Sequence, residues 1–451
     1  MSKREGKLSL GAFIYYSGHH SESWRHPSGS GHNPFDIDYF IEVAKTAERG
    51  KFDMMFLADY LHVSGAEQTA SGMLDPVTLL SAIAVHTKKL GLTATSSTTY
   101  NEPFHLARRY ATLDHISRGR AAWNIVTSQH DTEAQNFGKE KHPEHGLRYK
   151  MAEEYVDLVR NLWDSWDDKA LINDKENRKF IKPGSVKEIN YKGEWYASRG
   201  PLNVPRPPQG YPVLVVAGGS DAGIAFAAKT GEVVFTASQS LENSKAFYKK
   251  LQAKLAEENR DPRSIKIMPG ISPIIAETEE AAWAKYEELN QLISDDEALK
   301  TVSAFLGIDL SDYPATGPLP ELPDLAAQSN AMKSRIQLFI DSAREANLSI
   351  AQLGRKMHGA RGHLEFVGTP AQLADLLELW FNEYACDGFN IMPPVLPDHL
   401  TTFVDLVIPE LQKRGIFREE YEGDTLREHL GLIRPERNHF KKNKEQVSLQ
   451  I

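Results

Sequence analysis

Short apolar runs alternate along this chain with longer segments whose apolar residues recur at helical spacing. The apolar runs predict buried strands at Leu8–Tyr16, Asp53–Ala58, Leu90–Thr95, Ala121–Val126, Pro212–Val216, Val233–Ala237, Ile265–Ile275 and Gly388–Met392. The amphipathic segments predict helices at Asp36–Arg49, Val77–His86, Phe104–Ile116, Tyr149–Trp166, Ser220–Thr230, Glu242–Glu258, Glu279–Leu292, Pro370–Tyr384 and Leu400–Arg414. Thr278 is placed to cap the helix that begins at Glu279.

This alternation predicts the fold. Strands that alternate with helices indicate a parallel sheet of the α/β class, and about eight such units close into a (β/α)8 TIM barrel. The competing arrangement is an open, doubly wound sheet with a second domain. The number of strands and the absence of a dividing linker favour the barrel.

We therefore expect one barrel domain over residues 1–451. Two stretches interrupt the alternation of strands and helices and are expected to be insertions. The first covers about residues 167–210 and contains a small hairpin. The second covers about residues 295–365 and is partly helical over Asp324–Ala346. A C-terminal tail begins at about residue 416.

The composition says little about the fold, but it excludes several kinds of partner and site. The net charge of −9 provides no basic face for nucleic acid. Cys386 is the single cysteine, so an internal disulfide and a Cys-rich metal site are excluded, and it is expected to be structural. The charged N-terminus lacks the apolar centre of a signal peptide, and no stretch is long and apolar enough to span a bilayer. A cytoplasmic protein with no membrane partner is expected.

In such a barrel the active site lies where the strands end. The predicted strand ends carry hydroxyl, amide, imidazole and aromatic groups but few paired carboxylates. They are Tyr16–His20, Asp59-Tyr60, Thr95–Tyr100, Asn124–His130, Ala217–Ser220 and Met392–Pro394. A polar ligand site is therefore expected at this end of the barrel.

Gly218-Gly219-Ser220 is the best candidate for a phosphate site. Two glycines allow close backbone approach, and the helix that follows points its N–H groups at an anion. Ser220 could donate its hydroxyl or simply cap the helix. The dinucleotide pattern G-x-G-x-x-G is absent here.

Several residues have both a functional and an ordinary interpretation. His145 and Tyr149 are spaced to project from one face of a helix start, yet His145 could be a surface residue and Tyr149 a core residue. Asp59 could be a general base, a ligand contact or a helix cap. Trp24, Trp123 and Tyr100 could line a flat aromatic pocket or belong to the core.

Metal and nucleophile chemistry find little support. His19, His20 and His26 suggest zinc, but no H-E-x-x-H pattern accompanies them, so we expect no metal and instead a polar substrate pocket. No G-x-S-x-G elbow is present for a serine nucleophile.

Taken together, the motifs resemble one family: the nitrilotriacetate monooxygenase component A and dibenzothiophene sulfone monooxygenase group of bacterial luciferase-like flavin monooxygenases. The resemblance spans nearly the whole chain. The motifs that carry it are Trp24–Pro27, Leu57–Asp59, Ser97–Tyr100, Leu113–Arg120, Trp123–Ser128, Asn136–Gly138, Arg148-Tyr149, Ala152–Tyr155, Leu162–Trp166, Gly368–Pro370 and Asp387–Phe389.

The resemblance implies a barrel that binds FMN. Residues that match the family motifs would face the flavin ring or ribityl chain, namely Asp59, Thr95, Asn124, His145 and Tyr149. Ser96 and Ser97 are alternatives to Thr95. Ser220 and the backbone of Gly218 and Gly219 would hold the phosphate.

The implied activity is that of a two-component monooxygenase. A separate NAD(P)H-dependent reductase supplies FMNH2, and a C4a-(hydro)peroxyflavin inserts one atom of O2 into a small organic substrate. His145 and Tyr149 would act on the flavin side, and His20 is hypothesised to shape the substrate side. The family implies a homodimer or homotetramer. A deazaflavin F420-dependent oxidoreductase and a non-catalytic flavin-binding protein remain alternatives.

The second insertion contains Arg335, Arg355, Lys356, His358 and Arg361. If it forms a lid over the barrel, these residues would favour an anionic substrate such as a carboxylate or sulfonate. The alternative is a solvated basic surface.

Overall fold

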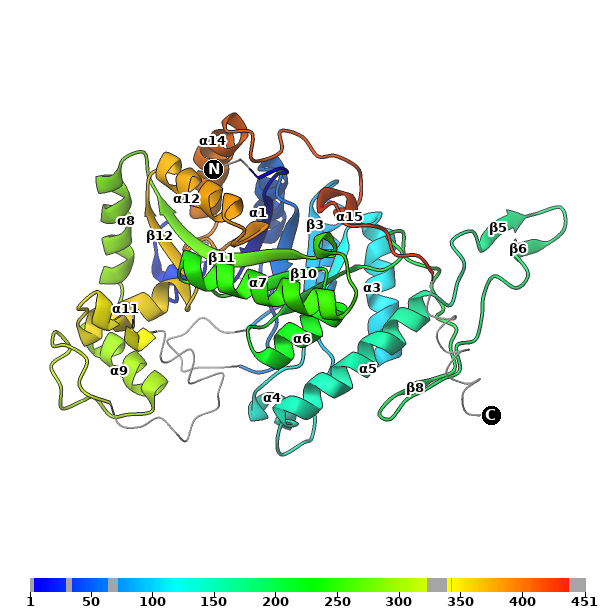
Figure 1. Cartoon of the computed structure of the whole chain (residues 1–451), viewed down its shortest axis with the longest axis horizontal. Helices are drawn as coiled ribbons and strands as arrows, with labels where there is room; N and C mark the ends of the chain where they lie inside the picture. The colour runs from blue at the N-terminus through cyan, green and yellow to red at the C-terminus, as the bar shows by residue number, and fades with distance from the viewer. Residues whose placement is uncertain (1–3, 30–34, 64–71, 323–338, 342, 438–451) are drawn as a thin grey trace.

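Eight parallel strands form a closed ring at the centre of the computed structural model, which describes residues 4–29, 35–63, 72–322, 339–341 and 343–437 (Figure 1). In ring order the strands are β1 (Ser9–Ile14), β2 (Met54–Leu57), β3 (Gly91–Ser97), β4 (Ala121–Val126), β9 (Val213–Ala217), β10 (Val233–Thr236), β11 (Lys266–Ile275) and β13 (Gly388–Ile391). The pairings of β10 with β11 and of β13 with β1 close the ring. The predicted barrel is confirmed, and the open sheet is excluded.

Helices surround the ring. They are α1 (Ile37–Arg49), α2 (Pro76–Ile83), α3 (Pro103–Ser117), α5 (His145–Trp163), α6 (Asp221–Thr230), α7 (Leu241–Glu257), α8 (Glu279–Gln291) and α12 (Pro370–Asn382), with the short α4 (Asp131–Asn136) before α5. Side-chain oxygens fix several helix starts by accepting backbone N–H groups that lack helical partners. The predicted cap at Thr278 is confirmed, because its side chain accepts from the Ala281 N–H.

The final helix is interrupted where the sequence predicts one continuous helix over Leu400–Arg414. It consists of α13 (Asp398–Thr402), a π-helical turn (Phe403–Val407) and α14 (Ile408–Lys413). Pro409 has no N–H to donate to the preceding turn, so a regular α-helical pattern cannot continue through it.

Two apolar layers hold the barrel together. One lies between the strands and the surrounding helices and includes Trp123, Tyr155 and Trp163. The other fills the interior of the ring, where alternate residues of each strand point. Its members include Phe13, Met54, Phe56, Ala122, Val213, Val215, Val233, Phe235, Met268 and Met392.

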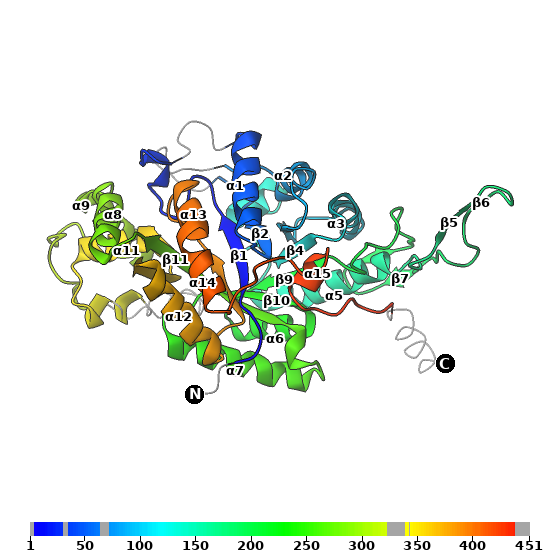
Figure 2. The same cartoon turned by 90° about the horizontal axis from the view of Figure 1, so that it is seen from above.

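The chain after the last barrel helix closes one end of the ring. Leu426 of α15 (Leu426–His429), with Leu430 and Leu432 just after it, joins the interior cluster. Arg418 pairs with Asp53 just before β2, and Arg427 pairs with Glu232 just before β10 at 2.6 Å. This segment therefore covers the amino-terminal ends of the strands, which leaves the carboxyl ends for a ligand (Figure 2).

The first insertion contains two hairpins rather than the single one expected. One pairs β5 (Leu171–Asp174) with β6 (Lys179–Ile181), and the other pairs β7 (Tyr191–Lys192) with β8 (Ala197–Ser198). All four strands lie outside the barrel ring.

The second insertion contains α9 (Asp295–Leu306) and α11 (Ile350–Ala360), followed by β12 (Leu364–Gly368), which extends the sheet beside β11 outside the ring. The sequence interpretation missed these elements, although Ser294 with Glu297 and Ser349 with Gln352 form capping boxes that mark both helix starts. The predicted helical stretch Asp324–Ala346 lies largely outside the described residues.

In the described ranges, no helix combines the length and the apolar character that crossing a bilayer requires.

Candidate functional site

The carboxyl ends of β3 and β4 form one polar wall of the barrel mouth. Thr95 and Asn124 are neighbours in register, and the Asn124 amide nitrogen donates to the Thr95 hydroxyl at 2.8 Å. The Thr95 hydroxyl in turn donates to the Leu57 carbonyl of β2 at 2.7 Å. This chain of bonds fixes the orientation of the Asn124 side chain.

The side-chain oxygen of Asn124 is buried and has no hydrogen-bond partner among the described residues. A buried carbonyl oxygen without a donor is costly, so such atoms usually mark a place where a ligand or water completes the bonding. The Asn124 side-chain oxygen at the barrel mouth is therefore available to accept a hydrogen bond from a ligand.

Strand alternation separates the three hydroxyl residues of β3. The Ser96 hydroxyl accepts from the Tyr110 hydroxyl at 3.0 Å in the outer layer, so it faces away from the barrel interior. Ser97 points the same way as Thr95 and accepts from the Ser128 hydroxyl at 3.0 Å. Thr95 and Ser97 thus share the inner face, and Ser96 does not.

Glu133 anchors the loop that follows β4. Its carboxylate accepts from the Ser128 hydroxyl and from the backbone N–H groups of Gln129 and His130, each at 3.1 Å. Burial opposes ionisation, but these backbone donors outweigh it and lower the pKa of Glu133. Sequence reasoning missed this residue, although its position three residues after the cap His130 fits a capping box.

Arg148 belongs to the same wall. One guanidinium nitrogen donates to the Ser128 carbonyl and lies 2.8 Å from His142 Nε2, while His142 Nδ1 bonds the Tyr100 hydroxyl. Ser128 has a positive φ of 57°, an uncommon conformation for a residue with a side chain, and the surrounding bonds stabilise it. Hydrogen bonds within the chain therefore hold this wall in place.

His145 and Tyr149 lie where the spacing places them, on the first turn of α5. Their ring centroids are 5.0 Å apart. His145 is exposed, and Tyr149 is half-buried against Phe226 at 5.7 Å. Partial burial, and then the charge of Arg148, lower the pKa of His145. Its imidazole is therefore neutral at neutral pH.

The Tyr149 hydroxyl lies against the glycine turn after β9. A Cβ placed on Gly218 or Gly223 would come within 3.6 or 3.2 Å of that hydroxyl, and one on Gly219 would meet nothing within 4 Å. The Ser220 side chain caps α6 by accepting from the Gly223 N–H at 3.1 Å. The capping role of Ser220 is confirmed, and its hydroxyl proton can still be donated outward.

Asp59 follows β2 and is half-buried. Burial, reinforced by the negative charge of Asp75, raises the pKa of Asp59 to about 7. Near neutral pH this carboxyl can therefore exist in either protonation state.

Replacing Asp59 with asparagine is expected to change the pH dependence of stability. Because the folded pKa lies above the unfolded value of about 3.9, wild-type stability is complete below that value and falls by up to about 4 kcal/mol as pH rises to about 7. Asp59→Asn removes this loss. Urea unfolding of the flavin-free protein should show that the free energy of unfolding of the variant, relative to that of wild type, increases from pH 4 to 7. Asp296→Asn, at an exposed carboxyl of α9, is the control, and an Asp59→Asn difference that stays constant with pH would contradict the account.

The loop after β1 forms the opposite side of the mouth. Tyr15 stacks on His19 with centroids 5.6 Å apart, and the Arg361 guanidinium lies 4.1 Å from the centre of the Tyr15 ring. Arg361 Nε also donates to the His19 carbonyl at 3.0 Å. The end of α11 is thereby fixed to the barrel mouth, a contact that sequence reasoning did not foresee.

His20 is buried in the same loop. Its Nδ1 accepts from the Glu22 N–H at 3.2 Å, so the proton of the neutral ring resides on Nε2. That Nε2 is buried without a partner among the described residues. Burial, and then the charges of His358 and Arg361, lower the pKa of His20 to about 3, so the ring is a neutral donor.

The three histidines considered as zinc ligands have different partners. His19 Nε2 bonds the Phe13 carbonyl at 2.9 Å, and His26 Nε2 lies 3.3 Å from Glu288. Over the described ranges, no three side chains of His, Cys, Asp or Glu are grouped as metal ligands.

The three aromatic residues considered for a flat pocket lie in different environments. Trp123 is fully buried in the outer core and donates to the Ser96 carbonyl at 3.0 Å, whereas Trp24 is exposed. Tyr100 stacks on Phe137 at 4.6 Å beside His142. Cys386 is buried, consistent with a structural role.

The basic residues of the second insertion do not form one charged surface. Arg355 pairs with Asp295 at 2.6 Å, and His358 bonds Ser21 and Thr301. Arg335 lies outside the described residues. Arg361 is the member of this group that stacks on a ring of the barrel mouth.

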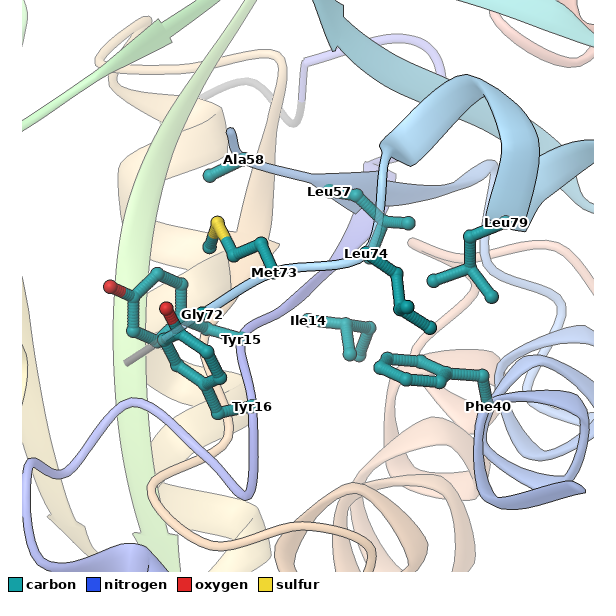
Figure 3. A pocket seen from close by; sticks show the side chains of 10 residues that line it. All are labelled: Ile14, Tyr15, Tyr16, Phe40, Leu57, Ala58, Gly72, Met73, Leu74 and Leu79. Atoms are coloured by element: carbon teal, nitrogen blue, oxygen red, sulfur yellow. The ribbon is translucent and has the colours of Figure 1, made fainter. Parts of the chain in front are cut away.

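An apolar cleft of roughly 340 Å³, part of it open to solvent, lies between the ends of β1 and β2 (Figure 3). Tyr15, Tyr16, Ala58 and Met73 line its side at the mouth. Ile14, Phe40, Leu57, Leu74 and Leu79 line the remainder. One lining residue, Ala58, precedes Asp59, and another, Tyr15, stacks against the Arg361 guanidinium. The apolar part of a ligand could therefore lie between Asp59 and Arg361.

Comparison with known proteins points to one family. The model of the family described as Luciferase-like monooxygenase matches residues 13–385. The chain is 53% identical to N-acetyl-S-(2-succino)cysteine monooxygenase of Bacillus subtilis over 437 residues, covering 96% of this chain and 99% of that one. It is 47% identical to nitrilotriacetate monooxygenase component A of Aminobacter aminovorans, covering 95% and 97%.

A solved structure shares the whole architecture. EDTA monooxygenase from Chelativorans sp. BNC1 superposes with a TM-score of 0.80 at 34% identity, covering 95% of this chain and 99% of that chain.

Proposed function

The chain belongs to the luciferase-like monooxygenase family and is a flavin-dependent monooxygenase, and we propose that it is the FMNH2-using oxygenase component of a two-component system acting on small organic anions. The observation that carries the flavin assignment is the buried, unpartnered oxygen of Asn124 in the wall formed by β3 and β4. An isoalloxazine ring presents N–H groups at its edge, and these are the donors that such an oxygen needs.

The proposed phosphate end is the turn after β9. The open space at Gly219, the N–H groups that begin α6 and the Ser220 hydroxyl suit a phosphate monoester. Asp221 is an acidic neighbour, but it pairs with Lys250 of α7 at 2.5 Å. We assign phosphate binding to Gly218, Gly219 and Ser220.

The residues between these two ends suit a ring and a sugar chain. Asp59, Thr95, His145 and Tyr149 are proposed to contact the flavin, with Asn124 at the ring edge. When bound, the reduced flavin supplies the electrons that split O2, so that one atom enters the substrate and the other leaves as water. The chain's own contribution is to orient the reactants with hydrogen-bond donors at the barrel mouth.

His145 and Tyr149 are proposed to be catalytic because both are hydrogen-bond donors on the first turn of α5, and the lowered pKa of His145 keeps its imidazole neutral near pH 7. Removing the imidazole with His145→Ala should lower turnover about 100-fold, the low end for a positioned proton donor. Because His145 is exposed, thermal stability should change by less than about 0.5 kcal/mol. Steady-state kinetics and thermal melts measure both. His105→Ala, at an exposed histidine of α3, is the control, and an equal effect of both changes would contradict the role.

We propose that His20 acts on the substrate side through its buried Nε2 proton, which is positioned to hold an oxygen of the ligand. Arg361, with its planar guanidinium fixed beside Tyr15, is proposed to bind a carboxylate. Two relatives act on compounds with several carboxylates, N-acetyl-S-(2-succino)cysteine and nitrilotriacetate. The adjoining apolar cleft would hold the hydrocarbon part of such a substrate.

The proposed partners are O2, the organic anion and an NAD(P)H-dependent flavin reductase. One relative is named component A, which supports a system in more than one part. A homodimer or homotetramer is proposed for the subunit assembly.

Titration with reduced FMN and with F420, followed by tryptophan fluorescence, distinguishes the proposal from an F420-dependent oxidoreductase. We expect saturation with FMNH2 and none with F420. Supplying the protein with a flavin reductase, NADH and N-acetyl-S-(2-succino)cysteine then tests for turnover. Binding of FMNH2 without oxidation of this or any screened anion would instead favour a non-catalytic flavin-binding protein.

A further inference from the structure

The hairpin of β5 and β6 stands clear of the rest of the molecule. It lies beyond the other labelled elements at one end in both views (Figures 1 and 2). Its base is held by the Lys182 N–H, which donates to the Ala170 carbonyl at 2.8 Å, and by a bridge between Trp166 and Val186. The body of the protein therefore fixes the direction in which the hairpin projects.

Apolar side chains are exposed on both faces of this hairpin. Leu171 lies opposite Ile181, and the neighbouring Ile172 and Phe180 point to the other face. Their exposed fractions are 47%, 38%, 41% and 63% respectively. A two-stranded hairpin is marginally stable by itself in water, so this arrangement indicates that an outside surface covers it.

Charge indicates what that surface is. Residues 169–182 carry five basic side chains and two acidic ones, a net charge of +3, whereas the whole chain carries −9, so the remainder carries −12. The basic residues are Lys169, Lys175, Arg178, Lys179 and Lys182, and the acidic ones are Asp174 and Glu176. The remainder of a second copy of this chain, with its net negative charge, complements a basic arm.

We propose that the β5–β6 hairpin is an association arm that packs on a second copy of this chain. Its apolar residues supply the buried contact, and its basic residues orient it on the acidic body. A nucleic-acid backbone would engage the basic residues but would leave the four apolar side chains in water, so it fits the hairpin less well. The inference rests on the homo-oligomeric assembly proposed above and is independent of the flavin and substrate assignments.

Light scattering after size-exclusion chromatography of the full-length protein, at several concentrations, tests the proposal. Combining Leu171→Ser with Phe180→Ser removes one large apolar side chain from each face. The dissociation constant of the assembly should rise at least tenfold, while FMN binding is retained. The charge variant Lys175→Glu with Arg178→Glu should weaken association without touching the apolar residues. Ile433→Ser, at a side chain that is 85% exposed on the body, is the matched control and should have no effect.

Three outcomes overturn the proposal. The first is a wild type that stays monomeric at every concentration. The second is a pair of arm variants that keep the wild-type mass on dilution. The third is an unchanged mass together with a loss of reductase-coupled turnover, which would assign the arm to the reductase instead.

Discussion

Ser220→Asp should raise the dissociation constant for FMN by about 100-fold or more. The side chain caps α6 at the proposed phosphate site, so the substitution places a second negative charge beside the phosphate. Two like charges about 4 Å apart repel by about 4 kcal/mol at the effective dielectric of a protein surface, and each 1.4 kcal/mol is a factor of ten in affinity. Aspartate caps helices as well as serine does, so the fold should be retained.

The same substitution at another helix provides the control. Ser240 caps α7 in the same way, by accepting from the Asn243 N–H. Ser240→Asp should leave FMN affinity within twofold of wild type. Fluorescence titration with FMN measures both variants. Equal affinities for Ser220→Asp and wild type would show that the phosphate lies elsewhere.

Arg361→Gln should raise the KM for N-acetyl-S-(2-succino)cysteine by about 30-fold or more and change kcat much less. Truncating one partner of a buried ion pair costs about 2–5 kcal/mol, and binding energy lost equally in ground and transition states appears in KM. The methyl esters of the same compound lack the charge and should bind the variant and the wild type alike.

Arg361 also supports the loop after β1, because it bonds the His19 carbonyl and stacks on Tyr15. Arg361→Lys keeps the charge and should recover part of the affinity if charge recognition is the cause. Arg355→Gln, within the helix that ends just before Arg361 and paired with Asp295, is the control for α11. If Arg361→Gln raises the KM equally for the acid and for its esters, Arg361 supports the loop and does not bind the carboxylate.

The barrel could be predicted because its determinants are local. Each strand is a short apolar run and each helix has its own periodicity, so Ala121–Val126 was predicted with the bounds that β4 has. The hydroxyls of β3 follow the same rule. Strand alternation alone separates Thr95 and Ser97 from Ser96 once the inner face is known.

The opposite side of the mouth could not be predicted, because it depends on contacts between distant parts of the chain. Arg361 reaches Tyr15 from the end of α11, 346 positions farther along the chain. The spacing of apolar residues along the sequence does not reveal that the end of α11 lies beside the loop after β1. The unpartnered oxygen of Asn124 likewise becomes visible only when every neighbouring donor is located.

The central claim is that reduced flavin bound at this barrel mouth directs one atom of O2 into an organic anion. The most direct measurement is mass spectrometry of the product formed under ¹⁸O2 from FMNH2, the protein and N-acetyl-S-(2-succino)cysteine. The account predicts a product that carries a single ¹⁸O atom derived from O2. A product whose added oxygen comes from water, or consumption of O2 with the substrate unchanged, would contradict it.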